Sequence, residues 1–219
     1  MSLLKKIFNQ QKYLEFKQDD KGLHQLGGDI PAGFTIPDND FLGGLQYLGF
    51  ISNEDKYFEW LPFSLNLICP ILTDFNYILL DYENPNKPKL IYPQNSGDVT
   101  SAYGELRKDS YIIYNKETFS LHPFRGITEE NEFDVVAIAG KPHWTQSSHV
   151  PTCPRSKKKM KFVCQLMSNG PITAKEKNFR SEDDYYEKLF MELNFWGDGD
   201  LKIFFEPTSK VACYFIQNT

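Results

Sequence analysis

The sequence has few cysteines, no long apolar run and no cleavable export signal. Its four cysteines are scattered along 219 residues, at Cys69, Cys153, Cys164 and Cys213. Three of them lie in apolar surroundings, where a free thiol behaves as a small hydrophobic group. No apolar stretch approaches the length needed to cross a bilayer, and the N-terminus lacks a small-residue cleavage site. We therefore expect a cytoplasmic protein without disulfides and without a membrane partner.

The chain also lacks an excess of basic residues. It has 24 Lys and Arg against 29 Asp and Glu, which gives a net charge of −5 at pH 7. Proteins that bind nucleic acid usually present a broad basic surface to the phosphate backbone. The charge balance therefore argues against a nucleic-acid partner.

Two glycine-containing segments resemble ligand loops but miss the residues that such loops need. The glycine pair at 27–28 is followed by Asp-Ile-Pro, whereas a phosphate loop continues with Gly-Lys-Ser or Gly-Lys-Thr into a helix. The segment 196–200 places two aspartates beside glycines, but no glutamate closes it at the spacing of a calcium loop. We interpret 196–200 as a tight turn.

No residue set provides a metal site or a catalytic constellation. Cys153, with His143 or His149 nearby, does not supply the four ligands of a structural zinc site. A catalytic histidine would need a nucleophile such as Cys153 or Ser147 and a third residue to orient it. The sequence predicts no catalytic residues, no metal and no required cofactor.

The residues that are present predict a folded, strand-rich protein. With 41% hydrophobic and 15% aromatic residues, the chain can bury a sizeable core. We expect residues 1–219 to form a single globular unit of the α+β class, mostly antiparallel β, with a few peripheral helices. Short segments rich in β-branched and aromatic residues predict strands at 45–51, 65–71, 77–82, 89–93, 111–114, 134–139 and 160–166, and a hairpin within 197–219.

Other segments favour helix or loop. Apolar residues at roughly helical spacing predict an N-terminal helix over residues 3–16. A Ser-x-x-Asp start predicts a second helix between 181 and 195. Residues 116–125 are expected to form a loop or a short helix, and the Gly, Asp and Pro content of 19–40 indicates an irregular loop.

Two parts of the chain, approximately residues 20–100 and 134–219, match each other in order. Residues 45–51 correspond to 160–166, 77–81 to 202–206, and 90–96 to 213–219. The last pair ends in Gln-Asn followed by Ser or Thr in both copies. The matches predict two similar β-rich halves related by an internal duplication, with a cleft at their seam, where ligands often bind.

The C-terminal motifs resemble a known family. They are Gly140-Lys141-Pro142-x-Trp144-x-Gln146, Pro151-x-Cys153-Pro154, and the segments 160–166, 197–199 and 211–219. In this order they resemble the bacterial YwqG-like (DUF1963) family and, more distantly, the programmed cell death 2 family, over roughly the last eighty residues. The resemblance implies a mostly antiparallel, duplicated β fold, and members are associated with toxin-immunity neighbourhoods.

The chain departs from this family at two places where related sequences often carry cysteines. Ser156 stands where a second cysteine would follow Cys153, and residues 206–209 read Glu-Pro-Thr-Ser in the hairpin turn. The resemblance therefore does not extend to a four-ligand zinc site.

Six residues are candidate ligand contacts: His143, Trp144, Gln146, Gln165, Trp196 and Gln217. The loop around Trp144 forms either part of a recognition cleft or a cap over the edge of the core. Gln165 and Gln217 lie on strands that otherwise read as core, so their amides either tie strands together or line the same cleft.

The absence of a catalytic constellation, together with the resemblance, favours a non-enzymatic binding protein that recognises a protein partner, such as an immunity-type antidote to a toxin. The alternative is a small-molecule-binding protein or hydrolase that uses the cleft between the halves through His143, Trp144 and Gln146. A pocket at that seam with convergent polar groups would favour the alternative. A seam closed by aromatic side chains would argue against it.

Overall fold

The structure is a computed structural model, and it describes residues 12–91, 99–128, 130, 134–168 and 171–218. Its helix is α2 (Asp184–Leu189), and its strands are β1 (Tyr13–Gln18), β2 (His24–Leu26), β3 (Gln46–Ile51), β4 (Leu65–Cys69), β5 (Thr73–Phe75), β6 (Ile78–Asp81), β7 (Lys89–Leu90), β8 (Val99–Ala102), β9 (Ile112–Tyr114), β10 (Glu117–Phe124), β11 (Ala137–Ala139), β12 (Lys161–Leu166), β13 (Ala174–Lys177), β14 (Asp200–Glu206) and β15 (Val211–Gln217).

Eleven of these strands form one antiparallel sheet in the order β4-β3-β2-β10-β1-β11-β12-β14-β15-β6-β7. Two short pairs, β13-β9 and β5-β8, lie outside it, and they too are antiparallel. The prediction of a mostly antiparallel β protein is confirmed. The predicted helix between 181 and 195 is present as α2, six residues long, and helix is scarce in the described residues.

The terminal hairpin, β14 and β15, follows the residue types expected for strands buried on both faces. Seven cross-strand pairs join it, from Asp200↔Gln217 to Glu206↔Val211. The Glu206 carboxylate closes the turn, because it accepts hydrogen bonds from the Thr208 and Ser209 backbone N–H groups at 3.3 and 2.6 Å. Aromatic and β-branched side chains of these two strands pack on both faces of the sheet, as is typical of strands buried on both faces.

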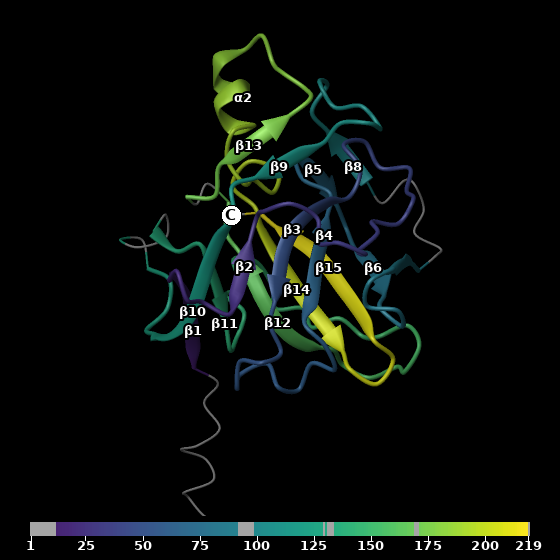
Figure 1. Cartoon of the computed structure of the whole chain (residues 1–219), viewed down its shortest axis with the longest axis vertical. Helices are drawn as coiled ribbons and strands as arrows, with labels where there is room; N and C mark the ends of the chain where they lie inside the picture. The colour runs from purple at the N-terminus through teal and green to yellow at the C-terminus, as the bar shows by residue number, and fades with distance from the viewer. Residues whose placement is uncertain (1–11, 92–98, 129, 131–133, 169–170, 219) are drawn as a thin grey trace, which may run out of the picture.

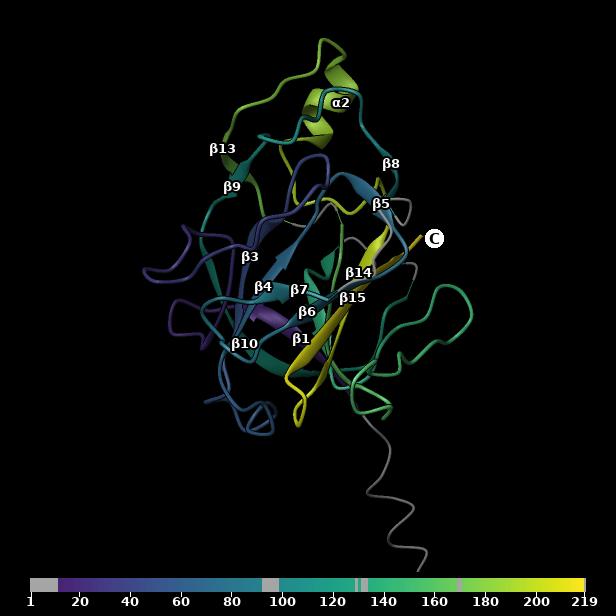
Figure 2. The same cartoon turned by 90° about the vertical axis from the view of Figure 1, so that its right-hand side faces the viewer.

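The sheet curls so that β3 and β4 face β14 and β15 across the main hydrophobic core (Figure 2). The rings of Phe63 and Phe205 lie 5.9 Å apart in this space. The Tyr82 hydroxyl donates to the Asn66 carbonyl at 2.7 Å and lies 3.0 Å from the Tyr214 hydroxyl. These contacts join the two ends of the sheet.

A second, smaller core covers the opposite face of β14 and β15. In Figure 2 the chain between β11 and β12 runs along this outer face, on the side away from β3 and β4. The buried members of this core are Cys153, Met160, Phe204, Val211, Cys213 and Phe215, and Trp144 packs against them. All four cysteines are free and buried.

The N-terminal helix predicted over residues 3–16 is wrong where the structure describes it. Tyr13–Gln18 forms strand β1, paired with β10 and β11, while residues 3–11 lie outside the described part of the chain. Leu14 and Phe16 are buried and Glu15 and Lys17 point away from the core, which is the two-residue alternation of a strand. Pairing on both sides overrides the helical spacing.

Two other segments also become strands. Residues 117–124, expected to be a loop or a short helix, form β10, and the predicted loop 19–40 contains β2. β10 lies between β1 and β2, and its backbone hydrogen bonds come from segments about a hundred residues earlier in the chain. Such distant partners leave little trace in local sequence preference.

The strand order does not confirm the internal duplication. Strand β12 pairs with β14, whereas their expected counterparts, β3 and β6, do not pair with each other. Residues 20–100 and 134–219 both contribute strands to the single large sheet, and β6 pairs directly with β15. Part of the match over 90–96 lies outside the described residues. The duplication therefore stays a prediction.

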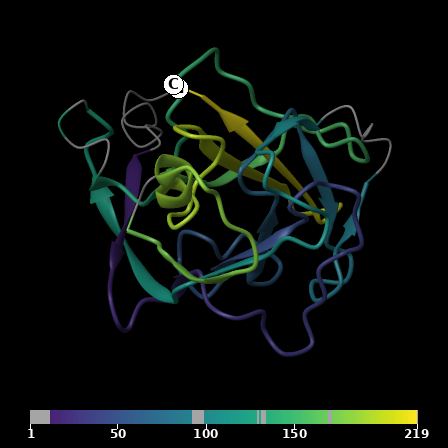
Figure 3. The same ribbon diagram turned by 90° about the horizontal axis from the view of Figure 1, so that it is seen from above.

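One end of the molecule is distinct from the sheet. Figures 1 and 2 both place α2 and β13 at this end, beyond the strands of the large sheet, and Figure 3 looks down on it. Within the described ranges, no helix combines the length and apolar character needed to span a membrane.

Candidate functional site

The segment 143–147, which we call the strap, crosses the outer face of the sheet near the C-terminus. It contains three of the six predicted contacts, and it meets two more. Its hydrogen bonds run from His143 N to Gln165 Oε1 (3.0 Å), from Gln146 Nε2 to the Asn218 carbonyl (3.2 Å), and from Gln217 Nε2 to the Ser147 carbonyl (3.2 Å). The structure therefore brings together all the predicted contacts except Trp196.

Trp144 closes this face with an aromatic stack. Its ring lies 6.2 Å from that of Phe204 and 6.4 Å from that of Phe215, with interplanar angles of 24° and 14°. Phe204 and Phe215 also stack on each other at 5.7 Å. All three rings belong to residues 134–219, so the stack packs Trp144 within one of the two proposed halves rather than beside a cleft between them.

Replacing Trp144 with leucine is expected to destabilise the protein by about 1–2 kcal/mol, because leucine keeps apolar contact but loses both ring stacks. Thermal or urea unfolding measures the change, and amide exchange at His143 reports the strap directly. Tyr57→Leu, a change at an exposed aromatic residue outside the strap, serves as the control. A Trp144 variant as stable as the wild type would show that the stack contributes nothing.

Beneath the strap lies a cluster of buried polar side chains. The strand register puts Gln165 opposite Lys202 and Asp200 opposite Gln217, so all four project from the same face. Gln165 Nε2 donates to Asp200 Oδ2 at 2.7 Å, and Lys202 Nζ lies 4.0 Å from the same oxygen. Gln165 thus links the strap to the charged pair on β14.

Lys202 is the least satisfied member of this cluster. Its side chain is fully buried, and its ammonium has no hydrogen-bond partner among the described residues. The ammonium lies 5.9 Å from the centre of the Trp144 ring. Burial lowers the pKa of Lys202 to about 8, and the nearby Asp200 carboxylate offsets part of that shift.

Asp200 and Lys202 were not predicted from the sequence, although a signal was present. They occupy alternate positions in a strand whose other residues are almost all apolar (DLKIFFE). Charged residues on a strand buried on both faces must be paired or functional. The strands that face them, however, become known only from the register.

Trp196 lies elsewhere, next to α2. Its ring is 5.0 Å from Tyr103, which also contacts Phe190 at 5.3 Å and Tyr186 at 5.4 Å. Phe190 is completely buried, whereas Tyr186 is exposed. A continuous set of aromatic rings therefore extends from the core to the surface at this end of the molecule.

Helix α2 is held at its start by local polar contacts. The Asp183 side chain caps it by accepting from the Tyr185 and Tyr186 backbone N–H groups. Burial alone would raise the pKa of Glu187, but hydrogen bonds from Lys177 Nζ at 2.7 Å and from the Ser181 N–H lower it overall. These contacts fix the orientation of the helix on the aromatic cluster.

The exposed side chains here define what we call the α2 surface: Glu182, Asp183, Asp184, Tyr185, Tyr186, Lys188, Met191 and Asp198. Tyr185 is the most exposed large hydrophobic residue in the described part of the chain, at 70%. A hollow of about 480 Å³ lies beside it, lined in part by Leu189, Glu192 and Asp198. The surface combines exposed rings, carboxylates and a concave region.

The charge of the molecule is concentrated on this segment. Residues 181–198 hold six of the 29 acidic residues and one of the 24 basic residues. The rest of the chain therefore has 23 of each sign. Counted along the chain, the excess of acidic residues therefore falls within 181–198, although Lys177 pairs with Glu187 from outside that range.

In the described ranges, no group of three or more His, Cys, Asp or Glu side chains is placed to hold a metal ion. Comparisons of the chain with protein-family models, with curated proteins and with solved structures found no match.

Proposed function

We propose that this is a non-enzymatic binding protein that recognises a protein partner through the α2 surface. The observation that carries the proposal is the charge distribution. Residues 181–198, which project from the sheet beside exposed aromatic side chains, hold five more acidic than basic residues, while the rest of the chain has equal numbers of each. Such segregation creates a local field that attracts a basic surface.

The side chains of the α2 surface are of the types that dominate protein interfaces. Tyr and Met are enriched at interface cores, and a few aromatic residues usually supply most of the binding energy. Tyr185 and Tyr186 lie 5.5 Å apart, and Tyr186 stacks on the buried Phe190 at 6.4 Å. Because the rings beneath are fixed, little conformational entropy is lost when a partner covers them.

The partner that fits this surface is a protein with a basic patch and an apolar depression for Tyr185. In the narrower form of the proposal the partner is a toxin and this protein is its immunity-type antidote. The experiment is to co-express the chain with the protein encoded by the neighbouring gene and to measure their binding in solution. Failure to bind would rule out the proposal that the partner is a toxin encoded by the neighbouring gene. Binding to other basic proteins would then test the broader proposal of a basic protein partner.

A double variant, Tyr185→Ala with Asp184→Lys, is expected to weaken partner binding at least tenfold, because it removes an exposed anchor and reverses a charge at the centre of the surface. Its stability is expected to fall by no more than about 1 kcal/mol, because both side chains are exposed and the new lysine opposes the helix dipole in the first turn of α2. Calorimetry measures the affinity, and raising the salt concentration is expected to slow association.

The matched control is Tyr57→Ala with Glu59→Lys, which makes the same two changes at exposed residues of another loop. It is expected to bind as the wild type does. Equal loss of binding in both double variants would show a general effect of charge, and no loss in either would overturn the assignment of the surface.

The proposal includes the finer features expected from the sequence. The C-terminal motifs support membership of the YwqG-like family and an internal duplication, and four free, buried cysteines support a cytoplasmic location. Superposition of residues 20–100 on 134–219 tests the duplication.

A further inference from the structure

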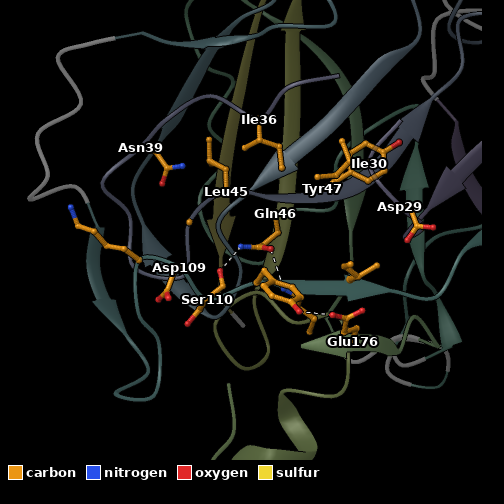
Figure 4. A pocket seen from close by; sticks show the side chains of 16 residues that line it. Asp29, Ile30, Ile36, Asn39, Leu45, Gln46, Tyr47, Asp109, Ser110 and Glu176 are labelled. Carbon is orange, nitrogen blue, oxygen red and sulfur yellow. Dashed lines mark hydrogen bonds between the residues drawn. The ribbon is translucent and has the colours of Figure 1, made fainter. Parts of the chain in front are cut away.

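A pocket of about 590 Å³ lies between β3, β9 and the segment 28–39, on surfaces that the α2 surface does not include (Figure 4). Apolar side chains, among them Ile30, Ile36, Leu45 and Tyr47, supply most of its wall. Its volume is that of a typical small-molecule site. Its lining comes from residues 28–47 and 108–113 together with Glu176, so it differs from the cleft at His143, Trp144 and Gln146 that the sequence suggested.

The buried side-chain amide of Gln46 joins the segments that form the walls of the pocket. Gln46 Nε2 donates to the Ser110 carbonyl at 3.1 Å and to the Gly43 carbonyl, and Gln46 Oε1 accepts from the Ile112 N–H at 3.1 Å (Figure 4). This side chain joins β3 to β9. Because its polar atoms are already bonded within the frame, the pocket is preformed.

The rim is charged, and its cations are already paired. Lys108 Nζ lies 2.7 Å from Asp40, and Lys175 Nζ lies 3.1 Å from Asp29. Two carboxylates in the lining are not paired with a cation among the described residues, those of Asp109 and Glu176. In Figure 4 Asp109 lies beside Ser110, and Glu176 lies on the other side of the pocket.

The Glu176 carboxylate accepts a hydrogen bond from the Tyr111 hydroxyl, which holds it at the edge of the pocket. The Asp109 carboxylate makes no hydrogen bond or ion pair within the described part of the chain. An apolar wall with two such carboxylates at its edge favours a ligand that is apolar along its body and positively charged at one end.

We propose that this pocket is a second binding site, and that it takes a small amphipathic cation with a primary ammonium group. The apolar body lies against Ile36, Leu45 and Tyr47, and the ammonium lies at the rim, where the carboxylates of Asp109 and Glu176 attract it from opposite sides. This site is separate from the proposed protein-binding surface.

The experiment titrates the full chain with two matched probes, 4-phenylbutylamine and 4-phenylbutyrate, followed by two-dimensional NMR. The amine is expected to cause saturable shifts at Gln46, Ile112 and Ile113, and to bind at least tenfold more tightly than the carboxylate, because the two probes differ in the sign of charge that meets the rim. Equal binding of the two probes, or tighter binding of the carboxylate, would overturn the cation assignment. Absence of saturable shifts with either probe would overturn the site itself.

Asp109→Asn and Glu176→Gln are each expected to weaken binding of the amine about three- to fivefold, as the loss of one exposed ion pair does, and to leave binding of the carboxylate unchanged or tighter. Asp20→Asn, a change at an exposed aspartate outside the pocket, is the control. Unchanged binding of the amine in both pocket variants would contradict the proposal. Binding at the α2 surface is measured separately with the Tyr185 variant, so the two proposals fail independently.

Discussion

Replacing Lys202 with methionine is expected to stabilise the protein by about 2–3 kcal/mol at neutral pH. The lysine ammonium is fully buried and has no hydrogen-bond partner among the described residues, and its one close charge, Asp200, is 4.0 Å away. Burial of a charge without full pairing costs free energy, and the attraction of Asp200, which the substitution also removes, offsets only part of that cost. Urea unfolding of the two proteins at pH 7 measures the difference.

The same lysine is expected to make stability depend on pH in an unusual direction. Its pKa is about 8 in the folded protein and 10.5 as the ordinary value. Between these two pH values the unfolded chain binds more protons than the folded one, so the free energy of unfolding rises with pH. The full shift corresponds to about 3 kcal/mol. The cost is complete below pH 8 and vanishes above about pH 10.5.

The variant isolates this effect from other groups that titrate at high pH. The stability difference between Lys202→Met and wild type is expected to shrink steadily from pH 8 to pH 10.5. Lys161→Met, a change at an exposed lysine of β12, is expected to alter stability at pH 7 by less than about 0.5 kcal/mol. A destabilised Lys202 variant, or a difference independent of pH, would show that the ammonium is satisfied in solution.

A buried lysine that lowers stability raises the question of whether the region around it has a function. Side chains that lower stability are found most often where they serve binding or chemistry. The strap covers Lys202 and contains three of the six candidate contacts. The stack of Trp144 on Phe204 and Phe215, however, fills the space next to the strap. Lys202→Met is therefore expected to leave binding at the α2 surface unchanged, because the two regions share none of their named residues.

The fold could be predicted from the sequence where strands carry strong preferences of their own. Residues 160–166 and the terminal hairpin are rich in aromatic and β-branched side chains, and they form β12, β14 and β15. Strands β1 and β10 were missed because they pair with each other over about a hundred residues of sequence. Their conformation is set by a partner that local preference does not contain.

In the candidate sites, too, some residues could be recognised from local sequence and others only from contacts between distant segments. Trp144 and Gln165 were recognisable as unusual residues, and the structure brings them close together. The Gln165–Asp200–Lys202 cluster depends on register across two strand pairs, so it could not be assembled from spacing. The excess of acidic residues in 181–198 could have been found by counting charged residues along the sequence. The pocket at Gln46 combines side chains from several distant segments, and no local signal marks it.

Gln165 is expected to be the residue on which the cluster depends most. Gln165→Leu leaves the buried Asp200 carboxylate without the donor that now lies 2.7 Å away, and it leaves the His143 N–H without its acceptor. Loss of a hydrogen bond to a buried charge and of a second to the strap is expected to cost about 3 kcal/mol. Urea unfolding measures this cost, and faster amide exchange at His143 reports release of the strap.

The control for Gln165 is Gln18→Leu, a change of the same type at an exposed residue of β1, expected to cost less than about 0.5 kcal/mol. The decisive comparison is the double variant with Lys202→Met. Lys202 and Gln165 both act on the Asp200 carboxylate, so the double variant removes both of these contacts at once. The cost of Gln165→Leu in the methionine background is then expected to exceed its cost in the wild type by about 1 kcal/mol or more. Strict additivity would mean that the lysine and the glutamine act on Asp200 independently, and the cluster would not be a unit.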